Sequence, residues 1–505
     1  MKAGMKPWIR TVALALVLAG GTPCLALGST EAPDPAQAQP QDATLQILLR
    51  KGIITQAEYD DAVAGARAAA GTVIRQTVVV EQTPRISAPP VTSRWGATLY
   101  GFVEADFVYD STQSFGDIAG NAIIAADGYA AKNHRLQFSV RNSRLGFRFA
   151  APDWGEVKSS AVLEMDFFGN QPGTPPAYGE GSWFGNPGIR IRLAYLKLET
   201  PIVDLVLGQN WALFGWQPYF SPNTVIIQGL PGQAFGRTVQ GRISRTVNTG
   251  SVNLELAVAA SRPPQRDAYV PDLQFGARVN VNDWKGVSTW GGTGTTFLSA
   301  SLGMSGAWRR FQVQEPSTEL GHPNGSAVAT GWGVSVNALI PVIPVRGNDR
   351  GNGLTFTGAF VTGAGISDLF TSLTGGLGSP SATPGIAPAV GYVANVDPGL
   401  VMFGTDGSLN AIAWQAFIVG LQYYLPPSGR VWVSVNYSNM YSSNIHEYAD
   451  PATVFERSHW ADGNLFWDAT NAVRFGVAYS WFRQIRADGT QATDNRVQLS
   501  AYYLF

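Results

Sequence analysis

The chain has 505 residues, of which 45% are hydrophobic and only 14% are charged, and its net charge is −1. This near-neutral balance gives no indication of a nucleic-acid partner, and a single cysteine excludes a zinc-thiolate site. A membrane-spanning helix needs about 20 apolar residues, and no run beyond the N-terminus reaches about 18, so a helical membrane bundle is excluded.

The first predicted element is an export signal. Three basic residues precede the short apolar run 11–19, and small residues then occupy positions 26 and 28, and again 36 and 38. A basic start, a short apolar run and a small-x-small site are the parts of a cleaved secretory signal. We expect residues 1–28 to be removed, with cleavage at 38 as the later alternative. Cys24 would leave with the signal, since Pro23 makes a poor lipoprotein site.

Residues 39–70 are the only stretch with a helical pattern. Residues 45–51 read as a short amphipathic helix, and Thr55-Gln-Ala-Glu58 is a capping box that would start a second helix. Isolated short helices are marginal in water. The segment therefore either packs on itself or on copies of itself, as a coiled coil does, or it is a nearly disordered tether. Residues 71–94, which contain three prolines, read as a linker.

From residue 95 onward, apolar and polar side chains alternate as they do in β-strands. The polar face carries charges in strand centres, at Glu104 and Asp106, at Glu164 and Asp166, and on the strand 188–199. Aromatic side chains lie toward the ends of the apolar face. A secreted β-sandwich or propeller would bury its apolar face. The pattern instead favours an inverted object that is apolar outside and polar within.

We count sixteen strands, with fourteen and eighteen as the alternatives. The expected strands are 97–110, 135–150, 155–168, 188–199, 202–209, 237–246, 251–262, 272–281, 295–310, 327–340, 352–365, 411–425, 430–442, 460–467, 471–483 and 495–505. Short links generally alternate with the long ones 111–134, 169–187, 210–236, 366–410 and 443–459. This alternation is typical of outer-membrane barrels, and sixteen strands leave room for an aqueous channel. We predict an all-β transmembrane antiparallel barrel over 95–505, in the outer membrane of a Gram-negative bacterium.

Three short passages carry a family resemblance: 141–148, 190–195 followed by 207–211, and 461–467. With them the chain resembles a bacterial porin and is most similar to the DcaP-like trimeric family. The resemblance implies a homotrimer surrounded by outer-membrane lipid, with residues 39–70 in the periplasm. It also implies that Tyr503 and Phe505, at the aromatic end of the last strand, form the signal read by the barrel assembly machinery. Residues 367–410 match no part of the family pattern.

The same resemblance points to the constriction of the channel. In a sixteen-stranded porin the third long loop folds into the lumen, and here that loop is 210–236, which contains no charged residue. General diffusion porins usually place carboxylates on this loop. Its aromatic residues are Trp211, Phe214, Trp216, Tyr219 and Phe220. They either anchor the loop to the wall, as buried rings usually do, or offer a surface for a ring-bearing solute such as a small aromatic carboxylate.

Strand parity selects the charged residues that line the pore. The candidates are Arg144, Arg148, Arg190, Arg192, Arg242, Arg278 and Arg474, with Glu104, Asp106, Glu164 and Asp166 as the acids. These arginines either pair with the acids across strands or remain as fixed positive charge in a narrow throat, which attracts anions. The excess of arginine predicts a weak preference for small anionic solutes.

Other functions fit less well. An outer-membrane enzyme would need a nucleophile with a histidine partner, and the four histidines fall in or beside predicted outer loops. A TonB-dependent receptor would need a larger plug than 39–94. A sugar-specific channel and a purely structural barrel remain as alternatives. We predict a porin for passive diffusion, with no enzymatic activity, cofactor or metal.

Overall fold

The computed structural model describes residues 49–51, 55–57, 59–60, 95–119, 122–169, 188–226, 230–315, 325–370, 374–381 and 391–505. The chain divides into two compact units, Met1–Val91 and Thr92–Phe505. In the first unit, helical residues occur at 49–50, 56–57 and 59–60, and the Tyr59 N–H donates to Thr55 O at 3.0 Å. The predicted signal, the rest of the helical segment and the whole linker lie outside the described residues. No described helix has the length and apolar character needed to cross a membrane.

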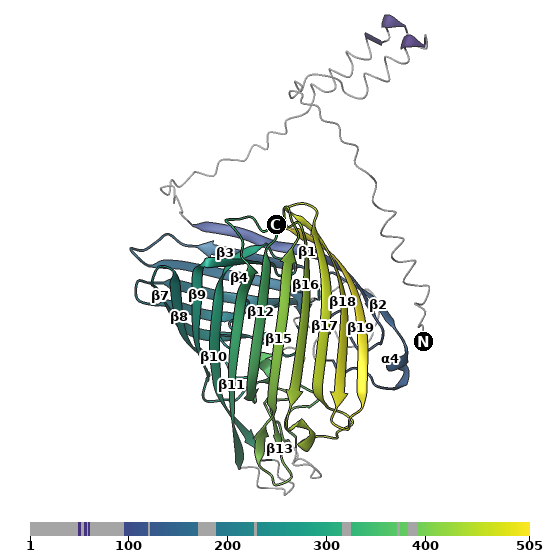
Figure 1. Cartoon of the computed structure of the whole chain (residues 1–505). Coiled ribbons are helices and arrows are strands. Elements are labelled where there is room, and N and C mark those ends of the chain that lie inside the picture. The colour runs from purple at the N-terminus through teal and green to yellow at the C-terminus, as the bar shows by residue number, and fades with distance from the viewer. Residues whose placement is uncertain are drawn as a thin grey trace, which may run out of the picture. The chain divides into compact units, whose positions relative to one another are not determined.

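The second unit is an antiparallel β-barrel (Figure 1). Its wall strands are β1 (Gly96–Asp110), β2 (Arg135–Ser139), β3 (Arg144–Ala150), β4 (Lys158–Gly169), β5 (Gly188–Glu199), β6 (Asp204–Trp211), β7 (Arg237–Asn248), β8 (Val252–Ser261), β9 (Asp272–Ser288), β10 (Thr296–Gln314), β11 (Ser326–Ile343), β12 (Leu354–Ala364), β15 (Ala413–Tyr424), β16 (Val431–Ser442), β17 (Phe455–Asp468), β18 (Val473–Arg486) and β19 (Gln491–Leu504). Strands β2 and β3 pair with successive parts of β1. They are therefore two pieces of one wall strand, and the barrel has sixteen strands as predicted.

Several predicted strand bounds needed correction; for example, the strand expected over 272–281 continues to Ser288. The strand expected over 135–150 is interrupted between Ser139 and Arg144 by a turn. The strand expected to begin at 460 begins at Phe455. The sequence pattern missed the extra residues because they are mostly polar, yet β18 continues to Arg486 and supplies backbone partners for them.

The first and last strands close the barrel. In the pairing of β1 with β19, Phe102 lies opposite Leu504 and Asp110 opposite Arg496. The chain end continues this seam, because Gly101 and Phe505 exchange backbone hydrogen bonds of 3.0 and 3.1 Å. Closure pairs the first strand with the last, so the wall forms a ring and not an open sheet, as a barrel in lipid requires.

Exposure of the side chains is inverted relative to a soluble protein. On β1, Leu99 and Val103 are 52% and 55% exposed, whereas Glu104 and Asp106 are almost fully buried. The same alternation of exposed apolar and covered polar residues runs along β18 and β19. An apolar outer face around a polar interior is that of a barrel that spans a bilayer, and such single-chain barrels belong to the outer membrane of bacteria.

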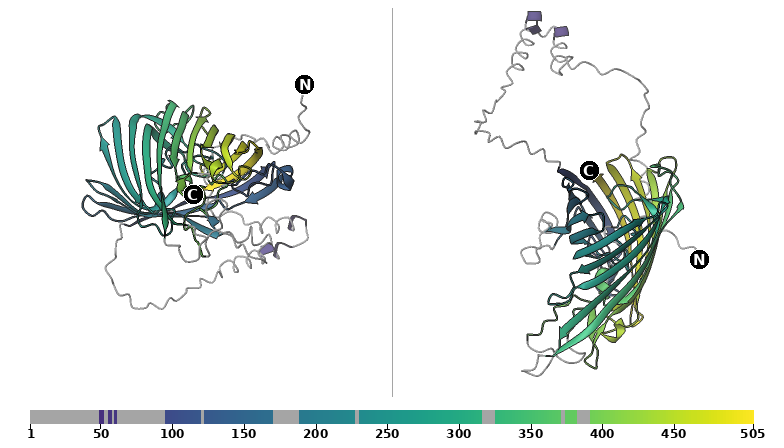
Figure 2. Two further views of the ribbon diagram at one scale, coloured as in Figure 1. Left: turned by 90° about the horizontal axis from the view of Figure 1, so that it is seen from below. Right: turned by 90° about the vertical axis from the view of Figure 1, so that its left-hand side faces the viewer.

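The two ends of the barrel differ. The turns beside the carboxyl terminus, at the top of Figure 1, are short, for example 200–203 and 249–251. At the opposite end lie longer connections. These carry the short helix α4 (Gly128–Lys132), the one-turn 3₁₀ helices η1 (Ser367–Leu369) and η2 (Ile445–Glu447), and the small hairpin of β13 (Val401–Phe403) and β14 (Leu409–Ala411). Figure 2 shows the strands of the wall from two further sides.

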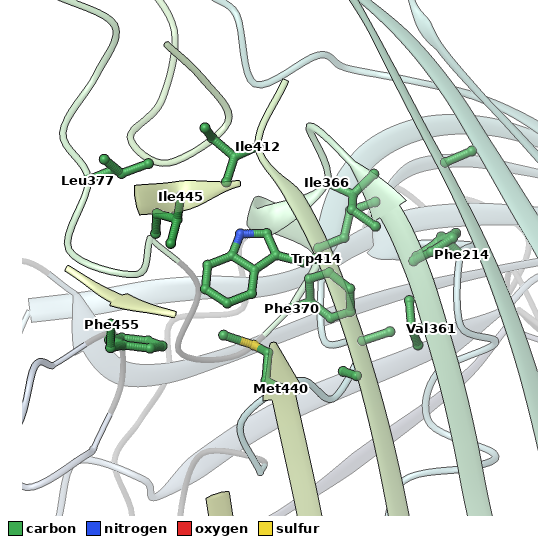
Figure 3. Packing of buried hydrophobic residues seen from close by; sticks show 14 of the residues in the cluster. Phe214, Val361, Ile366, Phe370, Leu377, Ile412, Trp414, Met440, Ile445 and Phe455 are labelled. Atoms are coloured by element: carbon green, nitrogen blue, oxygen red, sulfur yellow. The ribbon is translucent and has the colours of Figure 1, made fainter. Parts of the chain in front are cut away.

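Part of the barrel interior is filled by apolar side chains. A buried cluster at the long-loop end gathers around Trp414, with Met440, Phe455 and Ile445 on one side and Phe370 and its neighbours on the other (Figure 3). The cluster also includes Phe214 from the loop 212–236. The described parts of the connections 365–412 and 443–454 therefore contribute side chains to this buried cluster.

Candidate pore and its constriction

The loop that follows β6, residues 212–236, crosses the inside of the barrel; we call it the constriction loop. Hydrogen bonds fix its path: Phe214 N–H to Gln274 Oε1 (3.0 Å), Gly215 N–H to Ser305 Oγ (2.8 Å), Val225 N–H to Asn464 Oδ1 (2.9 Å) and Gln498 Nε2 to Val225 O (3.3 Å). The first two partners lie on β9 and β10, and the last two on β17 and β19. The described part of the loop thus spans the lumen between opposite walls and contains no charge.

Four of the five aromatic residues singled out at this loop are buried. Trp211, Phe214, Trp216 and Phe220 are at most 8% exposed. Trp216 lies so close to the wall that a side-chain carbon on Gly276 would come within 2.5 Å of its ring, so glycine is required there. These four rings are placed as anchors between loop and wall, while Tyr219, at 39% exposure, borders open space.

Four arginines and two acids gather where the constriction loop leaves the wall; we call them the arginine cluster. Its ion pairs are Arg190 Nη2–Asp166 Oδ2 (2.6 Å), Arg192 Nη1–Asp166 Oδ2 (2.8 Å), Arg192 Nε–Glu164 Oε1 (2.7 Å) and Arg144 Nε–Glu164 Oε1 (3.7 Å). Arg237 is the fourth arginine, and its guanidinium lies 5.1 Å from the Trp211 ring centre, which Arg192 also faces at 5.9 Å. Among the described residues Arg237 makes no ion pair.

The cluster is therefore both paired and positive. Glu164 and Asp166 hold three of the arginines across neighbouring strands, as cross-strand pairing predicts. The two carboxylates cannot neutralise four guanidinium groups, so a positive excess of two charges remains among these six residues.

The other predicted arginines are spread along the wall. Arg278 pairs with Glu255 and lies over Tyr219, 3.6 Å from its ring centre, and Arg474 Nε is 2.6 Å from Asp468 Oδ1. Arg148 lies 3.8 Å from the Tyr100 ring centre near the short-turn end, and Arg242 contacts Gln240 at 3.1 Å. They do not join the arginine cluster.

Two predicted acids, Glu104 and Asp106, are almost fully buried and lie outside the ion pairs of the described residues. Asn142 Nδ2 donates to Glu104 Oε2 at 2.6 Å, and Gln498 Nε2 donates to Asp106 Oδ1 at 3.0 Å. Neutral donors and neighbouring strands thus enclose both acids.

Two adjoining cavities open at the arginine cluster. The larger, of about 750 Å³, is lined by Arg144, Arg148, Glu164, Trp211 and Tyr219, among others. The smaller holds only about 30 Å³ and lies between Arg144, Arg192, Trp290 and constriction-loop residues. Because Arg144 and Trp290 line both cavities, the two lie side by side.

The sequence analysis did not identify three residues that the structure places inside the barrel. Arg237 is the first residue of β7 and has the opposite parity to Arg242, yet the structure stacks it on Trp211 inside the barrel. Trp290 lies between β9 and β10, in a connection to which the sequence analysis assigned no role. Arg309, nearly fully buried, joins Asp272 at 2.6 Å and also pairs with Asp368 of the connection 365–412. The only sequence signal for Arg309 is the pair of arginines at 309–310, in a strand otherwise rich in small and apolar residues.

Comparison with solved structures supports the fold. Over 81% of its length the chain is similar to the outer-membrane channel DcaP of Acinetobacter baumannii, with a TM-score of 0.57, 19% sequence identity and 97% of that chain covered. The barrel has the fold of DcaP.

Weaker likenesses are found to an anion-selective porin from Comamonas acidovorans (TM-score 0.44, 12% identity, 81% of this chain and 100% of that chain) and to the trimer form of the outer membrane protein OmpT of Vibrio cholerae (TM-score 0.44, 9% identity, 81% and 99%). No protein-family model and no curated protein matches the chain.

Proposed function

We propose that this chain is an outer-membrane porin: a water-filled channel for passive diffusion of small hydrophilic solutes, with a mild preference for anions such as small carboxylates. The observation that carries the preference is the arginine cluster, in which two carboxylates face four guanidinium groups beside the narrow cavity. Fixed charge in a narrow, poorly solvated throat concentrates counter-ions and repels ions of the same sign.

The uncharged constriction loop supports the same proposal. A loop carboxylate opposite the cluster would cancel its field, and residues 212–226 and 230–236 contain none. Arginine suits this role because its planar group stays charged and can pair, stack on a ring and still present a face to a passing carboxylate.

A more specific channel for aromatic acids is a second candidate. Trp211, Tyr219 and Trp290 line the larger cavity together with Arg144 and Arg148, so rings and positive charge border one space. A ring-bearing anion could use both kinds of surface. Liposome swelling with benzoate-sized anions and with neutral sugars of similar size separates this candidate from a general pore, since only the specific channel favours the aromatic acid.

The test of the main proposal is current through the refolded protein in a planar bilayer under a potassium chloride gradient. We expect stepwise conductance that is linear in voltage, with a zero-current potential that favours chloride. A zero-current potential that clearly favours potassium contradicts the anion preference, and the absence of conductance contradicts the pore itself.

We extend the proposal to assembly and delivery. A cleaved signal would bring the chain to the envelope, the barrel assembly machinery would read Tyr503 and Phe505, and three copies would form the working unit. Tyr503 is 55% and Phe505 46% exposed, so both rings are open to a partner. Conductance steps in groups of three, and a folded trimer band on mild gel electrophoresis, are the expected results.

A further inference from the structure

The β9–β10 hairpin does not end at the wall. Pairing of β8 with β9 stops at Val281, but β9 continues to Ser288. In the pairing of β9 with β10, Val281 lies opposite Ala300 and Lys285 opposite Ser299, so three residues of β9 have no counterpart. Extra residues in one strand bend it away from its former course. Residues 285–299 form the part beyond this bend, and we call them the hairpin tip.

The hairpin tip crosses the interior to the opposite wall. Its contacts are Val287 N–H to Thr355 Oγ1 (3.1 Å), Thr289 N–H to Gln422 Oε1 (3.2 Å), Arg474 Nη1 to Thr293 O (2.8 Å) and Gly291 N–H to Asn223 Oδ1 (3.1 Å). These partners lie on β12, β15, β18 and the constriction loop. Val287 and Thr289 are at most 1% exposed. The tip is therefore built into the lumen, from the short-turn end, and touches the constriction loop.

Trp290 is the residue of the tip that faces the arginine cluster. Its ring centre lies 5.8 Å from those of Trp211 and Phe235, and 5.8 Å from the guanidinium carbon of Arg144. It lines both the large cavity and the narrow one. The next residues approach β1 so closely that a side-chain carbon on Gly292 would lie 2.6 Å from the Phe102 ring, which fixes the position of the tip.

We propose that the hairpin tip is a second constriction element and that Trp290 sets the size limit of the pore, opposite Arg144 and Arg192. The narrow cavity is then enclosed by two inward folds: the constriction loop from the long-loop end, and the hairpin tip from the short-turn end. This inference rests on the proposed function, because it concerns the width of the same channel.

The first test uses thiol modification, since Cys24 is the only cysteine of the chain. In planar bilayers the W290C variant is treated with the negatively charged reagent sulfonatoethyl methanethiosulfonate. We expect loss of most of the current and a shift of the zero-current potential away from chloride, because a bulky anion is added beside the cluster. The matched control is W308C, whose tryptophan is 40% exposed on the outer face of β10. The reagent should leave its current, and that of the wild type, unchanged.

The second test is size. W290A should conduct roughly twofold more than wild type, since the narrowest cross-section limits ion flow, and should admit larger sugars in liposome swelling, whereas W308A should match wild type. If the wild type conducts but W290A keeps its conductance and size limit, and W290C current is insensitive to the reagent, the inference is overturned while the porin proposal stands. If the wild type itself does not conduct, the proposed function fails first.

Discussion

Neutralising Arg237 is the sharpest perturbation of the proposed selectivity. This arginine has no ion-pair partner among the described residues and is held over Trp211. The R237Q substitution therefore removes one of the two excess positive charges without leaving a buried carboxylate alone. Folding should be little affected, which makes the electrical effect interpretable.

The magnitude follows from the charge. An anion passing about 4 Å from a unit charge gains about 1 kcal/mol in water, which corresponds to about a fivefold change in its occupancy. We expect R237Q to reduce the chloride-to-potassium permeability ratio by about fivefold or more at low salt. The effect should shrink as the salt concentration rises, since screening shortens the range of the charge.

The assay is the zero-current potential under a potassium chloride gradient. The matched control is R245Q on the same strand, because the exposed Arg245 contacts the backbone of Pro201 and Ile202 at the short-turn end, whereas Arg237 stacks on Trp211, which lines the larger cavity. R245Q should keep the wild-type potential. Equal potentials for wild type, R237Q and R245Q would refute the reasoning that the arginine cluster sets ion preference.

Further variants test how the interior is held together. D166N leaves Arg190 and Arg192 without their shared carboxylate. Breaking a buried ion pair costs about 3–5 kcal/mol, and urea unfolding of the refolded barrel should show this loss. An unchanged free energy of unfolding would contradict it. W432A removes a fully buried ring whose centre lies 3.9 Å from that of Phe466. The free energy of unfolding should fall by about 3–5 kcal/mol in the same assay. D368N removes the ion pair between Arg309 and the connection 365–412 and leaves only the Arg309 bond to Gly365 O, so limited proteolysis of the connection should become faster. A wild-type cleavage rate would show that the ion pair does not hold the connection.

The wall could be predicted from the sequence because period-two alternation is a direct consequence of strand geometry. In β5, for example, Arg190 and Arg192 alternate with Ile189 and Ile191, and the structure exposes the two isoleucines at 65% and 54%. The pairing of these arginines with Glu164 and Asp166 was one of two alternatives from the sequence, since neighbouring strands bring opposite charges together, and the structure shows it.

The filling of the lumen could not be predicted in the same way. The hairpin tip depends on three unmatched residues in β9, and alternation alone does not show where a strand leaves the wall. Arg237 was not predicted to line the pore, because the alternation of inward and outward side chains breaks down at a strand end, where the chain turns into the loop. The packing of the described part of the connection 365–412 rests on contacts in a cluster with Phe214 and Met440, which lie outside it in the sequence, and no local pattern encodes them.

The seam between β1 and β19 has a consequence for biogenesis. Gln498, on the last strand, donates to Asp106 on the first strand and to Val225 of the constriction loop. Asn464 on β17 also holds Val225, so part of the loop's support on this side does not depend on the pairing of the last strand with the first. Pairing of the two ends then places Gln498 between Asp106 and the loop, so that closing the ring and fixing this side of the loop share one side chain.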